Sequence, residues 1–254
     1  GNLDLQLASS RALKLRPGLP PAVRFRAMLL ADAKKMDLAI SELQQFLKKD
    51  PDDVPALLQL AMLYTADDRP RKAIEIYTQV LAKEPEDWMA LRGRGDALLS
   101  IAKQAEAIAD YEKALKLRPE DDGILNNLAW VLATSPDAKL RNGKRAIELA
   151  TKACKLTKYK AAHILSTLGA ACAETGDFET AKKWSQKAIE LGREDQKEAL
   201  KKELQSYQQR KPCRELQQTP KKPERKPKPE PKPKPKPKTE KPEPKAEPTE
   251  VEFL

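Results

Sequence analysis

The chain repeats itself with a period of 34 residues, and this period constrains the fold more than any other feature of the sequence. The hexapeptide A-L-K-L-R-P occurs at 12–17 and again at 114–119, an offset of 102 residues, or three periods. Such self-similarity is typical of a repeat architecture, in which each unit stacks on its neighbours. Small residues recur in two columns: Ala27, Ala61, Gly95, Ala129 and Gly169 in one, and Ala39, Ala73, Ala107, Ala146 and Ala181 in the other.

The body of the chain divides into frames, each of which predicts a pair of helices. The five frames are 20–53, 54–87, 88–121, 122–161 and 162–195. In each frame apolar residues recur at i, i+3, i+4 and i+7 in two stretches, which predicts two amphipathic helices joined by a short turn. The small columns let paired helices approach closely, because a larger side chain would force their axes apart. We therefore expect an all-α fold.

The frames resemble the tetratricopeptide repeat (TPR) family. The residues of the third frame that match this family are Leu91, Arg94, Gly95, Leu98, Ala107, Tyr111, Ala114 and Pro119. The resemblance covers roughly Leu3 to Asp195 and implies a right-handed α-α superhelix, a TPR solenoid. In TPR folds the first helices of successive repeats line a concave groove, so the resemblance also implies a non-catalytic protein-interaction scaffold.

The chain departs from the TPR pattern at its turns. The turn glycine survives only as Gly176, whereas Lys34, Asp68 and Ala102 stand at the equivalent positions of the first three frames. The fourth frame is longer, because it carries the insertion 134–145 in its turn. This extended turn is similar to that of a group of bacterial TPR proteins, which are known chiefly as interaction scaffolds of undefined role.

The N-terminal end is expected to begin in the middle of a repeat. The first hexapeptide copy closes a second helix, but the matching first helix is absent. Residues 1–19 are therefore expected to form the second helix of a truncated repeat. Leu3, Leu7 and Leu13 would then lie on or near an uncapped edge, which leaves self-association of the chain open.

The C-terminal end is expected to be capped and then to lose regular structure. Residues 196–210 predict a charged capping helix, and its apolar stripe comprises Leu200, Leu204 and Tyr207. From 211 to 254 the chain is rich in proline, and lysine and proline nearly alternate at 226–238. Proline removes hydrogen-bond donors and neighbouring lysines repel, so we expect a disordered Lys/Pro-rich tail.

Binding is expected on the inner face of the solenoid. The resemblance implies that positions 2, 5, 9, 12 and 13 of each frame point into the groove, and arginine and tryptophan are common anchors of interfaces. Among these residues we expect Arg24, Arg92, Asn126 and Trp130 to make the main contacts. The alternative is that Met28, Met62 and Trp130 simply pack between neighbouring repeats. The predicted groove residues are Arg24, Met28, Leu58, Met62, Met89, Arg92, Asp96, Asn126, Trp130 and His163.

Catalytic and metal chemistry is not indicated. His163 is the only histidine, and Cys154, Cys172 and Cys213 lack C-x-x-C spacing, so no metal site can be assembled from them. We expect Cys154 and Cys172 to be small core residues. The R-G-R-G-D stretch at 92–96 contains an adhesion tripeptide, but it falls inside a predicted helix. The sequence therefore predicts no enzyme, no catalytic residue, no metal and no cofactor.

The sequence predicts a scaffold that binds a peptide segment or a protein partner, not identified by the sequence, in its concave groove. The alternative is binding of a polyanion through the basic tail: nucleic acid, an anionic envelope polymer or a membrane surface. The tail lacks the interleaved aromatic residues that stack on bases, which disfavours nucleic acid. No apolar run approaches the ~18 residues that span a bilayer. We expect a soluble protein, without a decision between cytoplasm and cell envelope.

Overall fold

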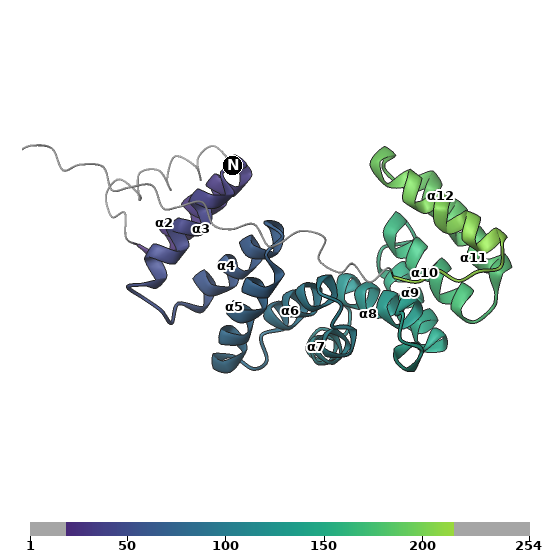
Figure 1. The fold of residues 1–254 in the computed structure, drawn as a ribbon, viewed down its shortest axis with the longest axis horizontal. Helices are drawn as coiled ribbons and strands as arrows, with labels where there is room; N and C mark the ends of the chain where they lie inside the picture. The colour runs from purple at the N-terminus through teal and green to yellow at the C-terminus, as the bar shows by residue number, and fades with distance from the viewer. Residues whose placement is uncertain (1–18, 216–254) are drawn as a thin grey trace, which may run out of the picture.

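The computed structural model describes residues 19–215, which form helices joined by short turns (Figure 1). Across this range there are eleven α-helices, one 3-10 helix and no strand. The prediction of an all-α superhelix is confirmed for this part of the chain. The bounds are α2 (Pro20–Asp32), α3 (Met36–Leu47), α4 (Val54–Ala66), α5 (Pro70–Lys83), α6 (Trp88–Ser100), α7 (Gln104–Leu117), α8 (Asp122–Thr134), η1 (Ala138–Leu140), α9 (Gly143–Leu156), α10 (Ala162–Glu174), α11 (Phe178–Leu191) and α12 (Glu194–Gln208).

Consecutive helices pack as pairs, and the pairs stack into an arch. The first pair is α2 with α3 and the fifth is α10 with α11; each pair lies within one predicted frame, and α12 packs on α11. In Figure 1 helices α6 and α8 follow the inner side of the arch, whereas α7 lies on its outer side. The first helices of successive pairs therefore form a continuous inner surface.

The two small-residue columns lie in the core. All eight alanines of these columns are fully buried, as the prediction of close helix packing requires. A methyl group added at Gly95 would lie 2.7 Å from Cε1 of Tyr111, so this glycine lets the tyrosine ring lie directly against α6. A methyl group at Gly169 would approach the Ala181 carbonyl oxygen to 3.2 Å. The columns are thus the contact lines between the two helices of a pair.

Aspartates at the ends of the first three frames start the next inner helix. The side chains of Asp53, Asp87 and Asp121 accept hydrogen bonds from backbone N–H groups in the first turns of α4, α6 and α8, at 2.7, 2.8 and 2.9 Å. Such N-caps satisfy donors that the helix leaves unpaired and stabilise it by about 1 kcal/mol. The three aspartates are spaced by 34 residues, so the period sets helix starts as well as packing.

Four of the turns inside the helix pairs contain a residue in the left-handed conformation, and only one of these residues is glycine. Lys34, Asp68 and Ala102 have φ values of 59°, 56° and 61°, and Gly176 has a φ of 85°. The left-handed region costs a residue with a Cβ roughly 1 kcal/mol. The missing turn glycines therefore leave the turn geometry unchanged and introduce local strain.

The insertion in the fourth frame forms a compact turn around η1. Asp137 caps η1 by accepting from the Lys139 N–H at 2.9 Å. Arg141 donates from Nη1 to the Ser135 carbonyl at 2.8 Å, and the Asn142 N–H donates to the Leu132 carbonyl at 2.8 Å. These bonds tie the longer turn back to the end of α8 before α9 begins.

The folded body extends further than the sequence indicated. The capping helix α12 buries Leu200 and Tyr207, and Leu204 is half-buried. The tail was expected to begin at residue 211, but residues 211–215 turn back from α12 and run across α10 toward α8 (Figure 1). We call this segment the strap; it is ordered against the body because its side chains find partners there.

Several predictions concern residues beyond the described range. The truncated N-terminal helix, the uncapped edge with Leu3, Leu7 and Leu13, and the Lys/Pro-rich tail after residue 215 all lie outside it. Within 19–215, none of the helices is long and apolar enough to cross a bilayer.

Candidate functional site

The inner surface is hollowed where α6, α8, α10 and α12 face one another. The hollow has a volume of about 530 Å³, and we call it the inner pocket. Tyr111 reaches it from α7, so five helices contribute to its walls. The lining residues are Asp96, Leu99, Tyr111, Asn126, Asn127, Trp130, His163, Ser166, Thr167, Asp195, Gln196, Ala199, Leu200 and Glu203.

A chain of hydrogen bonds fixes one wall of the inner pocket. Tyr111 Oη donates to Oδ1 of Asp96 at 2.5 Å, and Asn127 Nδ2 donates to the same oxygen at 2.8 Å. Asn126 Nδ2 donates in turn to Oδ1 of Asn127 at 3.2 Å. Oδ1 of Asn126 is buried and has no hydrogen-bond partner among the described residues. The wall therefore keeps an unpaired acceptor at the edge of an otherwise satisfied network.

Burial dominates the electrostatics of Asp96. Desolvation raises the pKa of its carboxyl, and the Tyr111 bond, the charge of Arg92 and the Asn127 bond oppose that rise. Burial also raises the pKa of Tyr111, so the phenol stays protonated and donates to the carboxylate. The guanidinium of Arg92 is itself paired with Asp121, at 3.6 Å.

A second half-buried carboxyl stands on the opposite wall. Glu203 of α12 accepts from the Ser166 hydroxyl of α10 at 2.6 Å through Oε2. Burial raises the pKa of Glu203, and the bond from Ser166 opposes the rise. Periodicity did not reveal Glu203, because α12 lies outside the repeat frames and was expected only to cap the solenoid. The sequence could have indicated this residue only by its place next to Leu204, in the apolar stripe of the predicted capping helix.

The structure brings some of the predicted groove residues together and separates others. Asp96, Asn126, Trp130 and His163 all line the inner pocket. His163 is exposed, and Trp130 is half-buried against the core. The predicted residues that do not line it are Arg24, Met28, Leu58, Met62, Met89 and Arg92.

The two predicted arginines are engaged within the solenoid. Nη1 of Arg24 lies 3.4 Å from the Asp53 carboxylate, and Nη1 of Arg92 lies 3.6 Å from that of Asp121. Each arginine thus bridges the first helix of its repeat to the N-cap of the next inner helix. This geometry makes both arginines parts of the repeat-to-repeat packing.

The three predicted methionines lie open to solvent on the first helices of the N-terminal half. Met28, Met62 and Met89 are 44%, 61% and 49% exposed. At this exposure Met28 and Met62 keep about half of their surface outside the packing between neighbouring repeats. Leu58 is half-buried and packs against the core.

The R-G-R-G-D stretch lies inside α6, where its charged residues already have partners. Arg94 makes two hydrogen bonds to Asp110, from Nε at 2.7 Å and from Nη2 at 2.8 Å. Asp96 belongs to the pocket wall described above. The stretch is therefore a helical segment, and it does not present an adhesion loop.

The cysteines of the described part do not form a reactive or metal-binding group. Cys154 and Cys172 are buried, and burial raises the pKa of each thiol to about 11. Cys213 in the strap is half-buried. No cluster of metal-ligating side chains occurs among residues 19–215.

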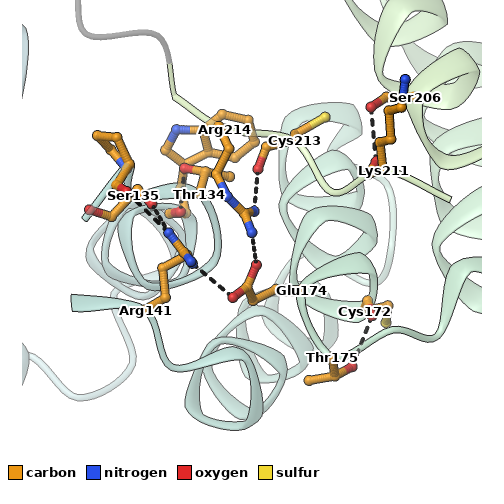
Figure 2. A network of polar contacts seen from close by, with 12 residues as sticks. Thr134, Ser135, Arg141, Cys172, Glu174, Thr175, Ser206, Lys211, Cys213 and Arg214 are labelled. Carbon is orange, nitrogen blue, oxygen red and sulfur yellow. Dashed lines mark hydrogen bonds and ion pairs between the residues drawn. The ribbon is translucent and has the colours of Figure 1, made fainter. Parts of the chain in front are cut away.

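A polar network holds the strap against the ends of α8 and α10 (Figure 2). Glu174 at the end of α10 binds two arginines, Arg141 Nε at 2.9 Å and Arg214 Nη2 at 2.7 Å. The N–H of Glu215 donates to the Thr134 carbonyl at 2.8 Å. Burial raises the pKa of the Glu215 carboxyl, and its contact with the indole of Trp130 opposes the rise. The strap therefore ends beside a wall of the inner pocket.

Comparisons with known proteins agree with this architecture. Two family models described as tetratricopeptide repeat match the chain, one at residues 58–122 and the other at 162–195. No curated protein matches the chain in sequence.

Solved structures with the same fold were found. MamA (41-end) from Desulfovibrio magneticus RS-1 is 21% identical with a TM-score of 0.59; the match covers 66% of this chain and 92% of that one. YrrB is 16% identical with a TM-score of 0.59, covering 77% and 98% of the two chains. The protein TTC0263 from Thermus thermophilus is 19% identical with a TM-score of 0.55, covering 74% and 97%. At these identities the likeness concerns the fold alone.

Proposed function

We propose that this chain, a tetratricopeptide repeat protein, binds a peptide segment of a protein partner in the inner pocket. The tetratricopeptide repeat fold serves as a protein-interaction scaffold. The observation that carries the proposal is that four successive inner helices converge on one hollow of about 530 Å³. A concave site with an apolar body and a few polar groups is the usual form of a ligand pocket.

The chemistry of the walls supports a peptide as the ligand. The unpaired Oδ1 of Asn126 is an acceptor that a peptide N–H would satisfy, which would remove the cost of a buried unpaired group. Trp130 offers a large apolar surface, and tryptophan is a common anchor of interfaces. YrrB, a neighbour in fold, is described as a TPR protein with an unusual peptide-binding site.

The exposed methionines extend the proposed surface toward the N-terminal half. Met28, Met62 and Met89 stand on α2, α4 and α6 with about half of their surface open. Methionine is flexible and polarizable, so it suits contact with an adaptable partner. We assign the main contacts to Asp96, Asn126, Trp130 and His163, and the methionines to an outer part of the same interface. Arg24 and Arg92 are better explained by packing between repeats.

Occlusion of the inner pocket tests the proposal without removing any contact of the folded chain. Ala199 lines the pocket and is exposed, so Ala199→Trp would fill part of the hollow. The matched control is Ala109→Trp, at an exposed alanine on the outer helix α7. We expect wild type and Ala109→Trp to bind the same members of a peptide array, and Ala199→Trp to lose most of them. Equal binding by all three proteins would refute the assignment of the groove.

A further inference from the structure

The inner pocket is acidic. Its lining includes Asp96, Asp195 and Glu203, and none of the described residues that line it is lysine or arginine. Asp195 is exposed and paired with Arg193 at 3.1 Å, so its charge is already compensated. Asp96 and Glu203 are the two carboxylates whose charge faces the hollow.

Each of these two carboxylates keeps one oxygen without a protein donor. Both hydrogen bonds to Asp96 reach Oδ1, and the bond to Glu203 reaches Oε2. No donor among the described residues reaches Asp96 Oδ2 or Glu203 Oε1. A desolvated carboxylate with an open oxygen favours a cationic donor, since charge-assisted hydrogen bonds are the strongest ones available to it. The pocket is therefore suited to an ammonium or guanidinium group.

The strap ends beside a wall of the pocket, and this chain's own basic segment follows it in the sequence. Glu215 is fixed by its N–H to the Thr134 carbonyl, and its side chain contacts Trp130, which lines the pocket. Residues 226–238 begin eleven positions further along and contain six lysines and one glutamate. A linker of this length gives the segment 226–238 an effective concentration at the pocket on the order of millimolar. An attraction too weak to act between separate molecules would thus act within the chain.

We propose that the inner pocket binds the Lys-Pro segment 226–238 of its own chain, with lysine ammonium groups paired to Asp96 and Glu203 and prolines against Trp130. Proline-rich segments dock on aromatic-lined grooves at a low entropic cost. The inference rests on the proposed function, because the bound segment would compete with a protein partner for the same pocket.

Two rings of the pocket can report on this occupancy in the full-length chain. His163 is the only histidine, and Trp130 is one of three tryptophans, so both ring signals are resolvable by NMR. The test variant changes the six lysines of 226–238 to glutamine, and the matched control changes them to arginine, which keeps the charge. At low salt we expect the ring signals of His163 and Trp130 to shift in the glutamine variant and to stay near wild type in the arginine variant. The indole signals of Trp88 and Trp184 should not move.

Further measurements separate this inference from its competitors. Since salt screens the attraction between the lysines of the solvated segment and the acidic pocket, ~0.5 M NaCl should shift the wild-type signals in the same direction as the glutamine change. In an Asp96→Asn, Glu203→Gln background, the glutamine change should have no further effect. The shifts should not depend on protein concentration; a dependence would mean that the segment comes from a second copy and would overturn the inference.

Identical His163 and Trp130 signals in wild type and the glutamine variant would also overturn it. The proposed function has its own readout, which is peptide binding by wild type and its loss in Ala199→Trp. If that loss is observed while the tail variants leave the ring signals unchanged, the groove function stands and self-binding fails. If the ring signals respond but no peptide binding is sensitive to Ala199→Trp, self-binding stands and the partner function fails.

Discussion

Replacement of Gly95 by alanine tests the close packing that supports the pocket wall. The added methyl group would lie 2.7 Å from Cε1 and 3.0 Å from Cζ of the fully buried Tyr111 ring, so the ring must move. Overpacking of this kind costs about 1–3 kcal/mol. Displacement of the ring also weakens the 2.5 Å bond from Tyr111 to Asp96, at a cost of about 1 kcal/mol. Alanine gains about 1 kcal/mol over glycine in a helix.

The balance predicts that Gly95→Ala lowers the free energy of unfolding by about 1–3 kcal/mol. The measurement is urea unfolding followed by far-ultraviolet circular dichroism. Gly123→Ala is the matched control, because its methyl group would meet only the far end of the Arg92 side chain, at 2.6 Å from Nη2, and that half-buried side chain can move. We expect Gly123→Ala to be nearly neutral or stabilising.

A double-mutant cycle locates the cause. In a Tyr111→Leu background the ring is gone, so Gly95→Ala should become neutral or stabilising as helix propensity dominates. The reasoning is refuted if Gly95→Ala is as stable as wild type, or if its cost persists without the tyrosine ring.

Two further predictions concern a turn and the strap. Ala102→Gly should raise the free energy of unfolding in urea by about 1 kcal/mol, because Ala102 has a φ of 61°. The control Ala109→Gly, inside α7, should lower it by a similar amount. The same change in unfolding free energy for both variants would contradict this reasoning. Glu174→Gln removes the charge that pairs with Arg214 of the strap and with Arg141 of the fourth-frame turn. Cys213 should then react several-fold faster with iodoacetamide at pH 8. Cys154 should stay unreactive in wild type and variant, because burial and a thiol pKa of about 11 leave little thiolate. An unchanged reaction rate at Cys213 would argue that the ion pairs of Glu174 do not hold the strap in place.

For the inner pocket, the periodicity of the sequence predicted the direction of side chains but not their partners. The 34-residue register predicted that Asp96 and Trp130 point toward the groove, because the direction of a side chain depends on its position in the helix, and both residues line the inner pocket. The same register chose Arg24 and Arg92 as contacts, and both are engaged with N-cap aspartates of the next repeat. A helical position indicates which way a side chain points, but it does not indicate which neighbour meets it.

The sequence alone determined the helical class, the spacing of the helices, the buried small columns and the helix starts. These features follow from local physics, since 3.6-residue periodicity, side-chain volume and capping act over a few residues and repeat every 34. Tertiary structure decided that Glu203 and Ser166 meet across the pocket from Asp96, and that Glu215 returns to Thr134, 81 positions earlier. Those contacts depend on the total rotation between successive repeats. This rotation adds up over many packing interfaces, so no single interface determines it.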